Sequence, residues 1–291
     1  MRAVLHAFFL HFSCKTMVAV VEYRHQTLKG VKMNIAIVTG ATSGMGKEFV
    51  LALDKQQQLD EIWVVARRQQ ILCDLQSQVQ AKIVPLALDL TKQESFEQFQ
   101  AKLQEASPNV KVLVNAAGFG KFLHFEKTPL ATLMQMIDLN CKALMAITYL
   151  TLPFMKQGAQ IYQMGSLSSF QPVPCINVYG ATKAFVLSFS RALNVELAPK
   201  QIKVMAVCPG WIKTDFFSTA IEDSTISYFN RYYTPQQVVE KALVDMKKGK
   251  DLSILGFPVR MQVRAVKFLP TKTVMKIWCK QQKINTKLDK K

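Results

Sequence analysis

Residues 35–46 read IAIVTGATSGMG, and this stretch decides the expected fold. Ile35–Val38 is a continuous apolar run, which is typical of a parallel strand that is buried on both faces. Gly40, Gly44 and Gly46 then permit a tight turn and a close approach of phosphate to the backbone, at the positive end of the following helix. The stretch therefore predicts a nucleotide-binding turn between a strand and a helix.

A second motif lies far downstream. Tyr179 and Lys183 are four residues apart, so on a helix they lie on one face. A fixed positive charge favours the phenolate, so we expect the pKa of Tyr179 to fall below its ordinary value of about 10. Ser166 precedes Tyr179 by thirteen residues and adds a hydroxyl group. The pair indicates an acid or base that could serve a carbonyl oxygen.

Together these motifs resemble the short-chain dehydrogenase/reductase family from about Asn34 to Leu255. The family's TGxxxGxG stands at Thr39–Gly46, its NNAG appears as Asn115-Ala116-Ala117-Gly118, and its PGxxxT stands at Pro209–Thr214. The resemblance implies the α/β class: a single Rossmann-like, doubly wound parallel sheet of about seven strands with helices on both faces. It also implies hydride transfer between a nicotinamide and a carbonyl or alcohol.

The resemblance implies a catalytic set of Asn140, Ser166, Tyr179 and Lys183. Ser166 would hold the substrate oxygen, and Tyr179 would deliver the proton. Lys183 would lower the pKa of Tyr179 and bind the nicotinamide ribose. Asn140 would anchor a proton relay, and its place in the middle of an expected helix, where asparagine is unfavourable, fits a specific role.

The end of the strand expected at Ile62–Ala66 bears on the choice of dinucleotide. Folds that prefer NAD place an acid there, whereas a phosphate favours arginine. Ala66 is followed by Arg67 and Arg68, so we predict NADP(H), with Arg67 as the preferred contact; a solvated helix start is the alternative. The other expected cofactor contacts, from the turn and the resemblance, are Gly40, Ser43, Gly44, Met45, Gly46, Asp89, Leu90, Asn115, Ala116, Tyr179, Lys183, Pro209, Gly210, Ile212 and Thr214.

The net charge of +17 is concentrated at the two ends of the 291-residue chain. Residues 1–32 carry five basic and one acidic side chains, and residues 247–291 carry thirteen and two, whereas residues 33–246 carry nineteen and seventeen. A nearly neutral body argues against nucleic acid as a partner. The six cysteines lack CxxC spacing, which predicts reduced thiols in the cytoplasm and no metal site.

We expect three segments. Residues 1–32 are interpreted as a disordered or artefactual extension, because Met33 leads straight into the first strand; a targeting or membrane-touching role is the alternative. Residues 33–256 form the catalytic domain, and residues 257–291 a basic, amphipathic helical tail. In the tail, lysines occupy one helix face and Val274, Ile277 and Trp278 the opposite one. This pattern predicts either contact with an anionic membrane or docking on the protein itself.

The sequence as a whole predicts an NADP-dependent oxidoreductase of small, hydrophobic carbonyl or alcohol substrates. Aromatic and aliphatic residues in the expected lid, residues 215–231, support the hydrophobic substrate. The apolar helix Val178–Leu197 predicts a homodimer or homotetramer by resemblance. Two alternatives stay open at this point: a dinucleotide-binding scaffold or regulatory protein without turnover, and a peripheral membrane enzyme that acts on lipids.

Overall fold

The computed structural model describes residues 32–56, 58–214, 216, 220–221, 223, 225–229 and 232–285. The extension expected at residues 1–32 lies outside these residues except for Lys32, and so do parts of the expected lid. The chain separates into two units, Met1–Met33 and Asn34–Lys291. The second unit contains the sheet and the helices.

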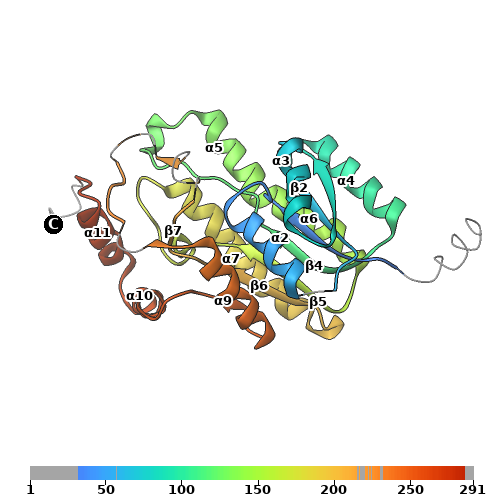
Figure 1. Cartoon of the computed structure of the whole chain (residues 1–291). Helices are drawn as coiled ribbons and strands as arrows, with labels where there is room; N and C mark the ends of the chain where they lie inside the picture. Colours follow the sequence, from blue (N-terminus) through green and yellow to red (C-terminus); the bar gives the residue numbers. More distant parts are fainter. Residues whose placement is uncertain are drawn as a thin grey trace, which may run out of the picture. The chain divides into compact units, whose positions relative to one another are not determined.

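A sheet of seven parallel strands forms the centre of this unit (Figure 1). Its strands are β1 (Asn34–Thr39), β2 (Glu61–Ala66), β3 (Lys82–Ala87), β4 (Asn109–Asn115), β5 (Met155–Met164), β6 (Lys203–Val207) and β9 (Leu252–Ser253). Their spatial order is β3-β2-β1-β4-β5-β6-β9, so the direction of winding reverses between β1 and β4. This topology confirms the expected doubly wound fold, in which ligands bind at the carboxyl edge near the reversal.

Helices cover both faces of the sheet. They are α2 (Gly44–Gln56), α3 (Gln69–Asp74), α4 (Gln93–Ala106), α5 (Leu130–Ile137), α6 (Leu144–Thr151), α7 (Asn177–Glu196) and α9 (Pro235–Lys247). Two further helices, α10 (Phe257–Phe268) and α11 (Thr271–Gln281), follow the last strand. The shorter elements are the 3-10 turns 75–78, 125–127, 152–154, 167–170 and 198–200, a π-helical segment Asp138–Ala143, and the strand pair β7 (Trp211–Ile212) and β8 (Tyr232–Tyr233).

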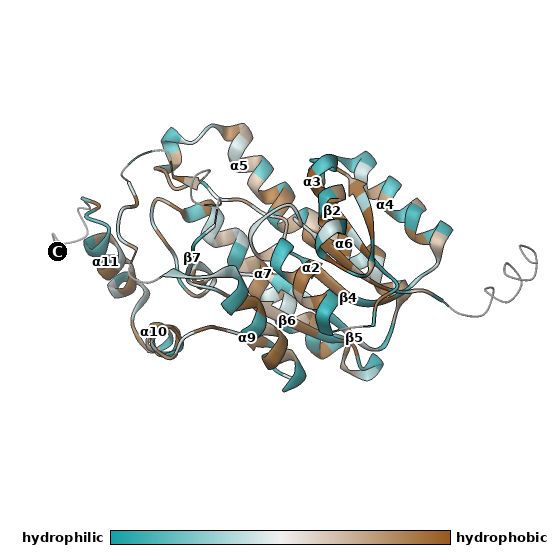
Figure 2. Cartoon of the chain, viewed as in Figure 1, coloured by the Kyte–Doolittle hydropathy of each residue, from teal (hydrophilic) through white to brown (hydrophobic). Residues whose placement is uncertain are grey.

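Strand β1 shows why the sheet needs apolar residues at successive positions. Ala36 and Val38 belong to a core that includes residues of α2 and α9. Ile35 and Ile37 belong to a second core that includes residues of α4, α6 and α7. Figure 2 shows the resulting pattern, with brown strands between helices that have teal outer sides. Both strand faces are buried, so the apolar run does not alternate with polar residues.

The carboxyl edge of the sheet collects the motifs. The glycine-rich turn follows β1, Ala116–Gly118 follows β4, Gly165 and Ser166 follow β5, and Pro209 follows β6. Segments that are more than one hundred residues apart in sequence therefore meet at one edge of the fold.

Candidate active site

A cavity of about 810 Å³ lies at this edge and contains most of the residues expected from the sequence. The expected residues that line it are Gly40, Ser43, Gly44, Met45, Gly46, Arg67, Asp89, Leu90, Ala116, Ser166, Tyr179, Lys183, Pro209, Gly210, Ile212 and Thr214. Two expected residues, Asn115 and Asn140, do not line it. One cavity thus joins the glycine-rich turn to the Ser-Tyr-Lys set.

The glycine-rich turn depends on its glycines for two different reasons. Gly40 and Gly44 have φ angles of 68° and 54°, in the left-handed region that other residues rarely adopt. Gly46 is required by close approach, because a Cβ atom there would lie 2.2 Å from the carbonyl oxygen of Gly40. Helix α2 begins at Gly44, so its N-terminal N–H groups and dipole lie beside the cavity.

The end of β2 gives this part of the cavity a positive charge. Arg67 and Arg68 both line the cavity, and Arg68 Nη2 donates to Thr42 Oγ1 at 3.0 Å. Asp89 lies nearby, and its Oδ1 accepts hydrogen bonds from the Thr91 backbone N–H at 3.1 Å and hydroxyl at 2.8 Å. Burial raises the pKa of Asp89, but these bonds and the charge of Arg67 outweigh it, so the pKa is lowered. Asp89 is therefore an ionised partner for Arg67.

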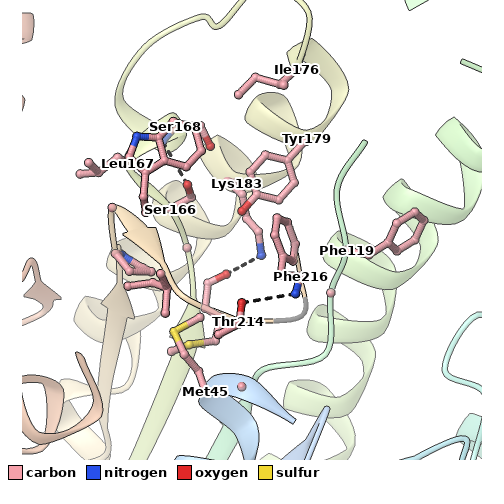
Figure 3. A pocket seen from close by; sticks show the side chains of 18 of the residues that line it. Met45, Phe119, Ser166, Leu167, Ser168, Ile176, Tyr179, Lys183, Thr214 and Phe216 are labelled. Carbon is pink, nitrogen blue, oxygen red and sulfur yellow. Dashed lines mark hydrogen bonds between the residues drawn. The ribbon is translucent and has the colours of Figure 1, made fainter. Parts of the chain in front are cut away.

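Tyr179 and Ser166 lie on facing sides of the other half of the cavity (Figure 3). Helix α7 supplies Tyr179, and the turn after β5 supplies Ser166, whose Oγ accepts from the Ser168 N–H at 3.2 Å. Burial raises the pKa of Tyr179 to about 12, and the hydrogen bond with Ser166 opposes this rise. The expected lowering of the Tyr179 pKa is therefore wrong in direction, because loss of hydration of the phenolate outweighs the other influences.

Lys183 is buried beneath Tyr179. Its Nζ donates to the carbonyl oxygen of Met164 at 2.8 Å and lies 5.6 Å from the centroid of the Tyr179 ring. Burial lowers the pKa of Lys183 to about 8, because the ammonium group loses water. The lysine thus changes charge near physiological pH, whereas Tyr179 keeps its proton there.

Asn140 lies in the π-helical segment Asp138–Ala143 rather than in a regular α-helix. Its Oδ1 accepts from the Phe119 N–H at 3.0 Å, and its Nδ2 donates to the Phe119 carbonyl at 2.9 Å and to Thr182 Oγ1 at 3.0 Å. Asn140 therefore ties the loop after β4 to α7. A Cβ atom on Gly118 would lie 2.9 Å from Asn140 Oδ1 and 3.4 Å from Lys183 Nζ. The relay role of Asn140 stays a prediction.

The side chain of Asn115 is held away from the cavity. Its Nδ2 donates to Thr148 Oγ1 on α6 at 3.0 Å, in a buried position. Ala116, the next residue, lines the cavity. Asn115 thus positions the backbone of a cavity-lining loop through its Nδ2, and its expected contact with a cofactor stays a prediction.

Comparison with known proteins places the chain in a family. The family model described as short chain dehydrogenase matches residues 34–225. The chain belongs to the short chain dehydrogenase family. A "Probable NADP-dependent dehydrogenase" of Haemophilus influenzae is 37% identical over 185 residues, which are 62% of this chain and 72% of that protein. An NADP-dependent 3-hydroxy acid dehydrogenase of Escherichia coli is 32% identical over 191 residues, 63% of this chain and 75% of the relative.

Solved structures agree with this assignment. A short-chain dehydrogenase from Sphingobium yanoikuyae in complex with NADPH superimposes with a TM-score of 0.70 at 26% identity, over 81% of this chain and 93% of that one. A serine dehydrogenase complexed with NADP+ has a TM-score of 0.66 at 28% identity, over 76% and 94% of the two chains.

The half of the cavity around Tyr179 combines Phe216 of the expected lid and residues of the tail with Phe122, which sequence reasoning did not select. The rings of Phe122 and Phe216 pack against Tyr179, with centroids 6.0 and 5.7 Å from its ring. Helices α10 and α11 add a wall of the cavity, with Val263, Leu269, Val274, Ile277, Trp278 and Gln282. The apolar helix face of the tail was the only sequence signal for this wall. The sequence does not show which surface of the protein that face contacts.

Proposed function

We propose that this chain is an NADP-dependent oxidoreductase that reduces the carbonyl group of a small, hydrophobic substrate to an alcohol. One observation carries the proposal: Ser166, Tyr179 and Lys183 meet in the same cavity as the glycine-rich turn and two arginines. The names of two relatives as NADP-dependent and the NADPH complex of a similar structure support the choice of cofactor.

The residues present fit a phosphorylated dinucleotide. The turn leaves no room for a Cβ atom at Gly40 or Gly46 and presents the N-terminus of α2, so it could hold a pyrophosphate. Arg67 and Arg68 could bind the additional phosphate of NADP. When bound, NADPH would supply the hydride.

The protein's own groups suit the proton transfer. With a pKa of about 12, Tyr179 is protonated at neutral pH and can donate to an oxygen that becomes negative. Ser166 can hold that oxygen by a hydrogen bond. Lys183, which is charged below its pKa of about 8, can stabilise the phenolate that remains after the transfer. A phenol that keeps its proton favours the reductive direction.

An apolar substrate is supported by the walls around Tyr179. Phe122, Trp211 and Phe216 form a cluster with ring centroids about 6 Å apart, with Phe122 at 6.2 Å from Trp211 and 6.1 Å from Phe216. Helices α10 and α11 close the same space with valine, leucine, isoleucine and tryptophan side chains. Such a surface favours burial of apolar rather than charged substrate groups.

A homodimer or homotetramer is our proposal for the assembly. Helices α5 and α6 expose apolar residues at helical spacing, namely Leu130, Met134, Ile137, Met145 and Tyr149, and α7 exposes Phe185. Such a stripe is typical of a subunit interface. Residues 130–154 also have the length and hydropathy of a membrane span, but their other side is core, with Met136, Leu144 and Ile147 buried.

The cytoplasm is the proposed location. Five cysteines are free among the described residues, which fits a reducing compartment.

The proposed activity can be tested by following reduced nicotinamide absorbance with purified protein and a panel of neutral ketones and aldehydes. We expect substrate-dependent oxidation of NADPH and much slower oxidation of NADH. Tight NADPH binding without oxidation by any carbonyl would contradict the enzyme proposal and favour the scaffold.

A further inference from the structure

The two C-terminal helices carry positive charge that their own sequence does not balance. Between Phe257 and Ile284 the chain has seven lysine or arginine residues and no aspartate or glutamate. Residues 33–246, in contrast, hold nineteen basic and seventeen acidic residues. The charge of α10 and α11 therefore favours an anionic partner.

Apolar side chains are exposed on the same helices. Phe268, the last residue of α10, is 88% exposed, and Met261, Leu269 and Ile277 are exposed as well. Met261 and Phe268 are seven residues apart, so they lie on one side of α10, and Leu269 follows directly after the helix. Exposed aromatic and aliphatic residues among basic ones are typical of a membrane-surface helix.

This exposed apolar face continues into the cavity. Leu269 and Ile277 both line the cavity and are exposed, so they stand at its mouth. Val263 and Val274 line it from buried positions further inside. An apolar route therefore leads from the outer face of α10 and α11 into the cavity that contains Tyr179.

The inner side of α11 is docked firmly on the protein. Trp278 Nε1 donates to the Pro174 carbonyl at 3.1 Å. Gln282 Oε1 accepts from the N–H groups of Ser227 and Tyr228 at 3.1 and 3.0 Å, and its Nε2 donates to the Tyr228 carbonyl at 3.1 Å. The two interpretations of the tail are thus compatible, because one side docks on the protein and the other side remains for a partner.

We propose that the outer face of α10 and α11 docks on an anionic lipid membrane, with Phe268 and Leu269 inserted among the headgroups. The mouth of the cavity would then face the bilayer, and a lipid-soluble carbonyl compound would enter without crossing water. The second statement rests on the proposed function, whereas the first does not.

A lipid surface fits both properties of this face better than other anionic partners do. Lys267 and Lys272 flank Phe268 and Leu269 in sequence, which places positive charge at the headgroups when the apolar side chains enter the interface. Nucleic acid or an acidic protein would satisfy the charge but would not require the exposed apolar residues at the mouth of a cavity.

Vesicle sedimentation of the full chain tests the docking. We expect at least about 10-fold tighter binding to phosphatidylcholine vesicles that contain about 30% phosphatidylserine than to phosphatidylcholine alone, and weaker binding in about 0.5 M NaCl. The double variants Phe268→Ser/Leu269→Ser and Lys267→Gln/Lys272→Gln should each lose about 10-fold in affinity.

A matched control removes the same charge elsewhere. Lys200→Gln/Lys203→Gln changes two exposed lysines next to the amino end of β6, at the opposite edge of the sheet, and should bind anionic vesicles like the wild type. Equal binding to both vesicle types would overturn the proposal. Loss of binding in the lysine variant but not in the Phe268/Leu269 variant would also overturn it, since it would indicate a purely electrostatic surface of the kind that nucleic acid uses.

Entry from the bilayer is tested separately by activity. We expect anionic vesicles to raise kcat/KM for a long-chain ketone dissolved in the lipid by about 10-fold, and to leave a short, water-soluble ketone unaffected. The single variant Phe268→Ser changes an exposed residue that does not line the cavity, so it should lose this gain and keep its rate on the soluble ketone. Vesicle binding without any gain would overturn entry from the bilayer, whereas inactivity on both ketones with intact vesicle binding would count against the proposed function alone.

Discussion

The two ends of the cavity are built in different ways. The cofactor end is formed by one short motif, in which a strand, a glycine-rich turn and the start of α2 follow directly in sequence. The substrate end is formed by separate segments after β5, between β7 and β8, and in α10 and α11. A local motif can be recognised in a sequence, whereas a surface assembled from distant segments depends on how they pack.

The two ends also differ in how much change they tolerate. At the cofactor end a single added carbon on Gly46 would lie 2.2 Å from a backbone oxygen. At the substrate end the walls are joined by a few side-chain hydrogen bonds from Trp278 and Gln282. We therefore expect substitution of a turn glycine to lower cofactor affinity strongly, and substitutions at the second end to change substrate affinity less.

The largest effect is expected for Gly46→Ala. The turn must open to accept the methyl group, at a cost of about 3 kcal/mol, so affinity for NADPH should fall about 100-fold. Isothermal titration would measure this loss. Gly158→Ala is the control, because Gly158 has a φ of 86° but no atom within 4 Å of an added Cβ. The control should lower stability by about 1 kcal/mol and leave NADPH affinity unchanged, and equal affinity losses would contradict the account.

Arg67→Ala should lower affinity for NADPH about 10-fold and leave affinity for NADH nearly unchanged. The reason is that only NADPH carries the additional phosphate. Tryptophan-to-nicotinamide fluorescence transfer measures both affinities. Arg68→Ala is the informative comparison, because Arg68 already donates to Thr42. A larger NADPH-specific loss in Arg68→Ala would assign the phosphate to Arg68 instead.

The pH dependence tests the buried lysine. Lys183 loses its charge as pH rises through about 8, so the reductive rate should fall about tenfold per pH unit above that value.

The stability of the fold should change in the opposite sense. Between about pH 8 and 10.5 the folded protein binds fewer protons at Lys183 than the unfolded chain does, so the free energy of unfolding rises with pH. Lys183→Met should remove the stability change, and a wild-type rate that is flat up to pH 10 would contradict this role.

The smallest effect is expected at the substrate end. Gln282→Leu removes the hydrogen bonds to Ser227 and Tyr228, so the KM for the carbonyl substrate should rise about 3- to 10-fold while NADPH affinity stays constant. Gln104→Leu, on the exposed side of α4, is the matched control. A change in NADPH affinity in Gln282→Leu would show that the two ends of the cavity are not independent.

The sequence correctly predicted those features that depend on the spacing of residues along the chain. The strand before Gly40, the turn up to Gly46, and the pairing of Tyr179 with Lys183 on one helix all follow from local geometry. Ser166, which was selected by its thirteen-residue spacing to Tyr179, lines the same cavity.

Properties that depend on burial could not be predicted in this way. The pKa of Tyr179 rises because surrounding residues exclude water, which its distance along the chain from Lys183 does not reveal. Asn115 and Asn140 were recognised by resemblance, but their amide groups bind Thr148 and Phe119 instead of lining the cavity. The apolar face of α11 could be recognised in the sequence. Its position beside the loops at the substrate end of the cavity could be seen only in the folded structure.

NADPH binding and NADPH oxidation, both measured in the wild type and in Tyr179→Phe, separate cofactor binding from proton donation at the proposed site. We expect the variant to bind NADPH with an affinity within about 3-fold of the wild type and to lose carbonyl reduction by about 10³-fold, because only the proton donor is missing. Preserved turnover in Tyr179→Phe would contradict the assignment of Tyr179 as the acid and, with it, the proposed reductase site.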